Sequence, residues 1–161
     1  MSVTSVDTDY DNLTFTLIAD FEAPIDQVWE LWSDPRKLEG WWGPPGYPAT
    51  FEKHDLMPGG EVTYFMTGPE GDRSHGMWRM TAVEPPTTLQ FTDAFADADG
   101  TPVADMPLST VRVELIERDG GTRMEMRSAF ESREDMEKAV STGTVEGLQQ
   151  AVTQMDGVLD A

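Results

Sequence analysis

The sequence contains no cysteine and only two histidines, His54 and His75. Without cysteine the chain has no disulfide, no thiolate ligand for a metal and no cysteine nucleophile. The two histidines lie on separate predicted strands without metal-binding spacing, and both are expected to point away from the interior. The sequence also lacks a glycine-rich phosphate loop, a serine nucleophile elbow and a paired-carboxylate motif. We therefore expect no metal site and no cofactor.

Basic residues are few, because 11 Lys and Arg stand against 30 Asp and Glu, a net charge of −19. Such a surface repels nucleic-acid phosphates and anionic lipids, so neither nucleic acid nor a membrane is an expected partner. No stretch approaches the roughly 18 apolar residues of a membrane span. The polar start, MSVTSVDTDYDN, is unlike a signal peptide. These features predict a cytoplasmic protein, whose acidic surface is either ordinary solvation or an adaptation to high salt.

The chain of 161 residues has the length of one domain. Residues 1–11 are polar and are predicted to form a flexible N-terminal arm. Residues 12–161 contain no linker and no internal repeat, and they are predicted to form a single domain.

Four of the five tryptophans lie in residues 25–46, IDQVWELWSDPRKLEGWWGPPG. The spacing of Ile25, Val28, Trp29 and Trp32 places them on one face of a helix, so a helix is predicted here. Asp34-Pro35 is typical of the start of a second helix, and the sequence GPPG ends it because proline cannot continue a helix. Each buried tryptophan removes roughly 200 Å² from water, so the two short helices are predicted to cover an apolar interior.

Alternating apolar and polar residues indicate about seven strands joined by turns, which is typical of an antiparallel meander. The expected strands are 13–22, 48–54, 61–67, 74–84, 89–96, 108–117 and 122–130. One face of a predicted long C-terminal helix carries Met136, Val140, Gly143, Gly147, Ala151, Met155 and Val158. The predicted fold class is α+β: a curved antiparallel sheet of about seven strands around this long helix, with two short helices after the first strand.

A series of short motifs then resembles a known group of proteins. The motifs are Ala23-Pro24 with Val28-Trp29, Asp34-Pro35 with Leu38, Trp41-Trp42-Gly43-Pro44, Asp55-Leu56 with Pro58-Gly59-Gly60, Gly76, Pro85-Pro86, Leu89 and Phe91-Thr92. In these motifs the chain resembles the helix-grip (START-like, Bet v 1-like) superfamily. The resemblance runs from about Phe15 to the end of the chain. Within it, the chain is similar to the family named after the activator of Hsp90 ATPase, in its small bacterial single-domain form. Two departures, Gly147-Leu148 and Asp93, stand where the family often has Gly-Trp and an aromatic residue.

The resemblance implies a cavity between the sheet and the C-terminal helix that holds a small apolar or amphipathic molecule. The residues expected near it are Trp32, Trp41, Trp42, Tyr64, Met66, Trp78, Phe91, Asp93, Met126 and Gly147. Because both departures alter the interior of this cavity, the identity of the ligand is not implied. The small residues of the C-terminal helix either allow close packing on the sheet or leave room for a ligand.

Asp93 is the candidate polar residue of this cavity, because it shares a strand face with Leu89, Phe91 and Phe95. It either reaches water or an arginine at a bulge or strand end, or acts as a polar anchor or acid–base group inside the cavity. In the second case desolvation would raise its pKa.

Binding of a small hydrophobic or amphipathic ligand is the function that we favour. The family name implies an alternative, a co-chaperone that stimulates the ATPase of Hsp90. Relatives in the superfamily resemble polyketide cyclases and dehydratases. Inward-facing His and Glu are scarce in this sequence, and the available acid–base groups are only Asp93, Tyr64 and Arg79, of which Asp93 is the catalytic candidate, so we do not expect an enzyme. The sequence leaves open whether the outer sheet face forms a homodimer.

Overall fold

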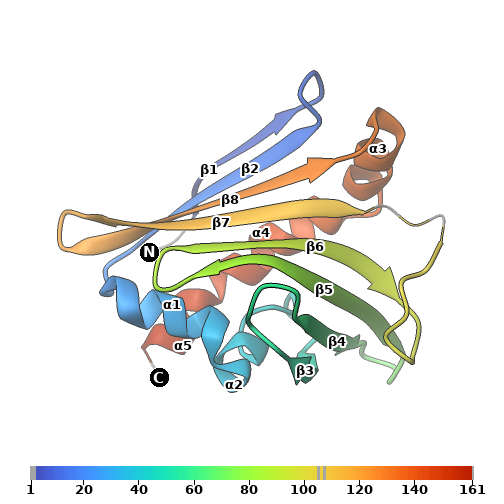
Figure 1. Ribbon diagram of the computed structural model, residues 1–161, viewed down its shortest axis with the longest axis horizontal. Helices are drawn as coiled ribbons and strands as arrows, with labels where there is room; N and C mark the ends of the chain where they lie inside the picture. The colour runs from blue at the N-terminus through green and yellow to red at the C-terminus, as the bar shows by residue number, and fades with distance from the viewer. Residues whose placement is uncertain (1–2, 105, 107, 161) are drawn as a thin grey trace.

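The computed structural model describes residues 3–104, 106 and 108–160. It shows one curved antiparallel sheet of eight strands with helices over one face (Figure 1). The strand order is β1-β2-β8-β7-β6-β5-β4-β3. The strands are β1 (Val3–Asp9), β2 (Thr14–Phe21), β3 (Ala49–His54), β4 (Glu61–Thr67), β5 (Arg73–Glu84), β6 (Thr88–Ala96), β7 (Ser109–Arg118) and β8 (Gly121–Phe130). The helix-grip architecture and the α+β class are therefore confirmed.

The two helices predicted after the first long strand are α1 (Ile25–Ser33) and α2 (Pro35–Glu39). The Asp34 side chain accepts a hydrogen bond from the Arg36 amide at 2.9 Å and so caps α2. The buried face of α1 carries Val28, Leu31 and Trp32, whereas Trp29 is only partly buried. The helix is thus rotated relative to the predicted face, because Leu31 takes a core position that we gave to Trp29.

The prediction of a flexible arm was wrong for Val3–Asp9, which forms the edge strand β1 paired with β2. Most of this strand is exposed, and it shows no burial alternation. Backbone hydrogen bonds to the edge of β2 hold this strand in place, and burial of an apolar face contributes little. A strand of this kind leaves no hydrophobic pattern in the sequence.

The predicted single long C-terminal helix is three consecutive helices, α3 (Arg133–Ser141), α4 (Thr144–Thr153) and α5 (Met155–Leu159). Gly143 separates the first two with φ of +83°, a left-handed conformation that glycine adopts without steric cost. The Ser132 hydroxyl caps α3 by accepting a hydrogen bond from the Asp135 amide at 3.1 Å. The apolar stripe continues across the breaks through buried Met136, Ala151 and Met155.

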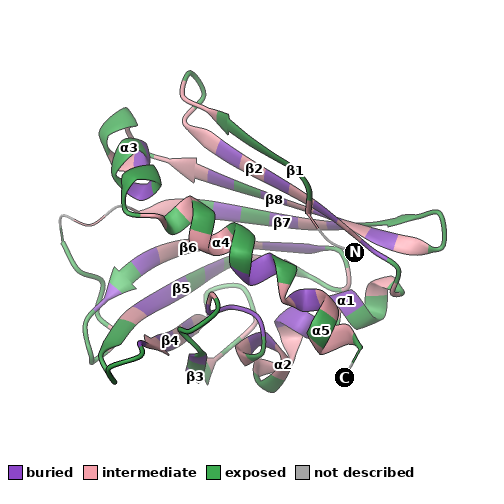
Figure 2. Ribbon diagram, turned by 180° about the vertical axis from the view of Figure 1, so that it is seen from behind, coloured by how far each residue is buried: buried purple, intermediate pink, exposed green. Residues whose placement is uncertain are grey.

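Figure 2 shows α4 running across the sheet, with its buried residues near α5. The buried residues of α4 are Ala151 and Val152, at its C-terminal end, whereas Thr144 to Gln150 are intermediate or exposed. One end of α4 therefore packs on the core, and the other end is held away from the sheet. The space beneath this second end is a cavity.

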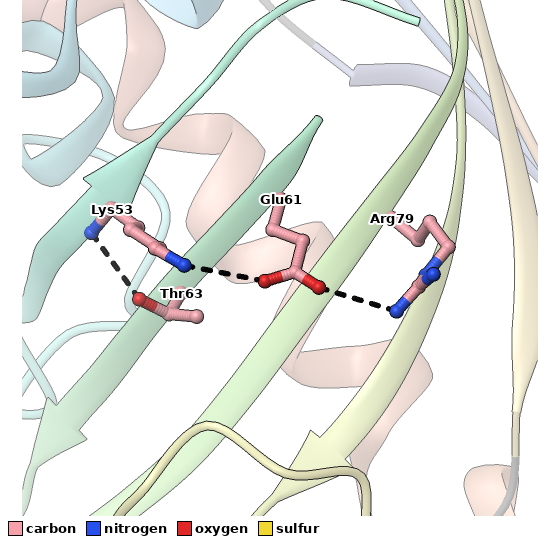
Figure 3. A network of polar contacts seen from close by, with 4 residues as sticks. All are labelled: Lys53, Glu61, Thr63 and Arg79. Carbon is pink, nitrogen blue, oxygen red and sulfur yellow. Dashed lines mark hydrogen bonds and ion pairs between the residues drawn. The ribbon is translucent and has the colours of Figure 1, made fainter. Parts of the chain in front are cut away.

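Part of the outer face of the sheet is polar, as the ion pairs of Figure 3 illustrate. Glu61 on β4 lies 3.4 Å from Lys53 Nζ on β3 and 3.2 Å from Arg79 Nη2 on β5. The three side chains are substantially exposed, and such pairs each contribute only about 0–1 kcal/mol. They offset a small part of the repulsion among the 30 acidic residues.

We predict that salt stabilises the protein. The net charge of −19 makes repulsion in the folded state larger than the attraction within exposed ion pairs. The Debye length falls from about 10 Å at 0.1 M to about 3 Å at 1 M salt, which screens this repulsion. The urea midpoint should rise from low to molar NaCl; a midpoint that stays constant or falls would contradict a surface limited by repulsion.

Candidate ligand-binding cavity

A cavity of about 250 Å³ lies between the sheet and the N-terminal part of α4. A dry cavity of about 150 Å³ is large enough for benzene, so this volume admits a molecule of roughly ten non-hydrogen atoms. Its floor comes from the inner face of the sheet, and its cover comes from α3, α4 and Pro44. The lining is formed by Phe15, Trp42, Pro44, Tyr64, Met66, Ser74, His75, Asp93, Ala94, Phe95, Ser109, Val111, Met126, Ser128, Phe130, Ala139, Thr142, Gly143, Thr144, Val145, Gly147 and Leu148.

Six of the ten residues expected near the cavity line it: Trp42, Tyr64, Met66, Asp93, Met126 and Gly147. The other four do not, and they are fully buried: Trp32, Trp41, Trp78 and Phe91. These four belong to an aromatic cluster in which Trp78 stacks on Phe91, with ring centroids 4.3 Å apart. The tryptophans of the helix pair thus mainly fill the core, and Trp42 alone among them reaches the cavity.

Asp93 gives the cavity a polar end. The Tyr64 hydroxyl donates a hydrogen bond to Asp93 Oδ1 at 3.3 Å. Burial raises the pKa of Asp93 to about 7, and the hydrogen bond from Tyr64 lowers it in part. Burial also raises the pKa of Tyr64 well above its usual value, and the charge of Asp93 raises it further. Tyr64 therefore stays protonated and serves as a donor.

Gly76 on β5 explains how Tyr64 reaches Asp93. It pairs with Tyr64 across the sheet, and a Cβ at this position would overlap the phenol ring and its hydroxyl. The absence of a side chain lets the ring pass over Gly76 of β5 and reach Asp93 on β6. The Gly76 motif of the sequence thus has a structural role at the polar end of the cavity.

Two indole groups lie close to Tyr64, with ring centroids 5.9 Å from its own for both Trp42 and Trp78. They lower the pKa of Tyr64, against the larger effect of burial. Neither indole N–H meets hydrogen-bond geometry, and both are buried without a partner among the described residues. The proton of Tyr64 is directed to Asp93, because an ionised carboxylate can only accept a hydrogen bond.

The loop that carries Trp42 is fixed by the C-terminal helices. The Gln154 amide, between α4 and α5, donates to the Gly43 carbonyl at 2.6 Å and to the Trp41 carbonyl at 3.2 Å. Gly43 itself lies so close to the Tyr47 carbonyl that a Cβ would overlap it. These contacts hold Trp42 and Pro44 at the edge of the cavity.

Several lining residues were not predicted from the sequence, among them the serines Ser109 and Ser128. Ser128 is buried and lies on the same face of β8 as Met124 and Met126, so strand parity could have identified it. The residues of the α3–α4 junction could not be found in this way, because their position depends on the break at Gly143.

The histidines differ from each other. His75 contacts the outer-face Phe65, with ring centroids 5.6 Å apart, and also contributes to the cavity lining. The expectation that His54 points away from the interior was wrong, since its Nε2 lies 3.0 Å from the Trp32 carbonyl. A register shift between Phe51 and Lys53 reverses the parity of the strand, which turns His54 back towards α1.

The described residues contain no cluster of three or more His, Asp or Glu that could hold a metal ion. Among the same residues, no helix combines the length and the apolar character needed to cross a membrane.

Comparisons with known proteins agree with this architecture. The profile of the family described as Activator of Hsp90 ATPase homolog 1-like protein matches residues 22–160. The crystal structure of a Mycobacterium smegmatis protein, 46% identical to this chain, superposes with a TM-score of 0.90 over 98% of this chain and 96% of that one. The solution structure of an Arthrobacter aurescens protein, 45% identical, has a TM-score of 0.94 over 98% of this chain and 92% of that one.

A more distant relative shows the fold alone. A protein from Staphylococcus epidermidis is 20% identical, with a TM-score of 0.84 over 98% of this chain and 94% of that one. A search of curated proteins gave no significant match.

Proposed function

The chain belongs to the family of Activator of Hsp90 ATPase homolog 1-like proteins, and we propose that it binds a small hydrophobic or amphipathic molecule in the cavity beneath α4. The observation that carries this proposal is the cavity itself, which combines apolar walls with one polar end at Asp93. Such a combination is typical of small-molecule sites. Proteins with this fold commonly bind hydrophobic ligands, which supports the proposal.

Most of the wall is apolar and adaptable. Phe15, Val111, Met126 and Leu148 come from four different elements and surround the space on several sides. Methionine fills irregular gaps and adjusts to ligands of different shape, so Met66 and Met126 suit a site that accepts compact apolar bodies. Lys and Arg are absent from the described lining, so the described lining offers no lysine or arginine charge to pair with an acidic ligand.

The two alternatives have less support. A pKa of about 7 would suit Asp93 for proton transfer, but no other described carboxylate lines the cavity to share acid–base roles with it. A co-chaperone role rests on the family's name, and no surface of the described residues argues for it. A pull-down with Hsp90 and an ATPase assay would test that role separately.

We predict that butylbenzene, with ten carbon atoms, quenches or shifts tryptophan emission and raises thermal stability along one saturation curve. Trp42 lines the cavity, and the other rings of the aromatic cluster lie close to it. A ligand that binds the folded form alone stabilises it by about 2.7 kcal/mol at a hundredfold excess over its Kd. Fluorescence titration and calorimetry measure the two signals.

A matched pair of variants tests where the ligand binds. Gly147 lines the cavity and has open space around its Cβ position up to Pro44 Cγ at 3.8 Å, so Gly147→Leu should fill the space and abolish binding. Gly157 in α5 is also helical and open but does not line the cavity, so Gly157→Leu should bind like the wild type. Equal binding by both variants would exclude this cavity as the site.

A further inference from the structure

We infer that the ligand carries a hydrogen-bond-donating head group without negative charge, such as a hydroxyl, which binds Asp93 at the polar end of the cavity. The inference rests on the proposed function and specifies the chemical class of its ligand. It comes from the direction of the hydrogen bond between Tyr64 and Asp93 and from the absence of lysine and arginine among the described lining residues.

One hydrogen bond at this end fixes the role of Asp93. The Tyr64 hydroxyl donates to Asp93 Oδ1, so Asp93 is the acceptor. The indole N–H groups of Trp42 and Trp78 are donors without a partner among the described residues, so they offer no acceptor to a ligand. A buried carboxylate accepts several hydrogen bonds, and it is destabilised when they are not made.

Asp93 has unused acceptor capacity that faces the cavity. Its Oδ2 atom has no hydrogen-bond partner among the described residues, and the side chain keeps some accessible surface although it lies deep in the protein. The cavity reaches this side chain directly. A ligand hydroxyl that enters here gains a hydrogen bond to a charged acceptor, whereas an ether oxygen gains none.

An acidic ligand meets the opposite situation. Besides Asp93, the titratable groups of the described lining are Tyr64 from β4 and His75 from β5; α3, α4, β7 and β8 contribute none. A ligand carboxylate would therefore lose its hydration close to a second carboxylate, with no lysine or arginine among the described residues to pair with it. Fatty acids and aromatic acids should be rejected whenever Asp93 is ionised.

A set of ligands with one apolar body and different head groups tests this inference by calorimetry on the whole protein at pH 8. Butylbenzene has no head group, para-butylphenol has a neutral donor, para-butylanisole has an acceptor only, and para-butylbenzoate is an anion. We expect para-butylphenol to bind about tenfold tighter than butylbenzene, because hydrogen bonds to charged groups are the strong ones. Para-butylanisole should gain nothing, and para-butylbenzoate should bind about tenfold weaker than butylbenzene or not measurably.

Two further measurements show whether Asp93 or His75 causes the pH dependence of ligand binding. Lowering the pH from 8 to 6 should strengthen binding of para-butylbenzoate, since Asp93 becomes protonated around pH 7. In Asp93→Asn the ratio between phenol and benzoate affinities should shrink, and this pH dependence should disappear. If the pH dependence survives in that variant, His75 is its source and the role given to Asp93 is overturned.

The outcomes also distinguish this inference from the proposed function. If butylbenzene binds and para-butylbenzoate binds as tightly as para-butylphenol at pH 8, the inference fails while the cavity remains a ligand site. If butylbenzene does not bind at all, or binds equally well to Gly147→Leu, the proposed function fails and the inference fails with it.

Discussion

The Asp93→Asn variant is expected to be more stable than the wild type above pH 7 and about equally stable near pH 4. Burial raises the pKa of Asp93 from 3.8 to about 7 in the folded protein. Between these values the folded state binds one more proton than the unfolded state, so stability falls as the pH rises. The shift corresponds to roughly 2–4 kcal/mol at pH 8, the lower figure allowing for water in the cavity. Asparagine avoids this loss because it carries no charge and can still accept the hydrogen bond from Tyr64.

Urea unfolding of both proteins from pH 4 to pH 9 measures this difference. Asp7→Asn, at an exposed position of β1, is the control for the loss of one negative charge from an acidic protein. The wild type and Asp7→Asn should lose stability between pH 4 and pH 7 in parallel, and the curve of Asp93→Asn should be flatter. Parallel curves for all three proteins would show that the Asp93 carboxylate is well solvated.

Trp78→Ala is expected to cause the largest loss of stability of any substitution considered, roughly 3–5 kcal/mol. Trp78 is fully buried, stacks on Phe91 at 4.3 Å and lies edge-on to Trp42 at 4.8 Å between ring centroids. Removing the indole leaves a cavity between the sheet and the two short helices, and neighbouring rings can fill it only in part. For a chain of this length the Tm should fall by roughly 10 °C or more.

Trp29→Ala is the matched control, since it removes the same side chain from a partly buried position on α1. It should cost clearly less, because Trp29 only packs against the edge of the core. Similar losses in the two variants would contradict the central position given to Trp78.

The fold could be predicted largely from the sequence because most strands bury one face. Strand alternation placed β4 and β8 within a residue of their observed bounds. It failed for β1, which buries no apolar face, and for His54, where a bulge reverses the parity. The break at Gly143 was also missed, since a glycine on a helical stripe has the same spacing whether it permits close packing or a left-handed turn.

The candidate site was only half predictable for a related reason. Strand parity states which side of the sheet a residue faces, and in the structure Tyr64, Asp93 and Met126 lie on the side that lines the cavity. It does not state what lies above the residue. Trp78 and Phe91 share that face but lie under the two short helices, whereas Asp93 lies under the raised end of α4. The boundary between core and cavity depends on how the helices pack on the sheet. A local sequence pattern carries no information about this packing.

The cavity beneath α4 as a ligand site is the central claim, and the methionine methyl groups can test it most directly. The chain has ten methionines. Met66 and Met126 line the cavity, whereas Met57 is exposed and Met155, the first residue of α5, is buried away from the cavity lining. In protein with labelled methionine methyl groups, intermolecular NOEs from bound butylbenzene should appear at Met66 and Met126 and be absent at Met57 and Met155. NOEs at Met57 or Met155 without any at Met66 and Met126 would place the ligand elsewhere and contradict the account.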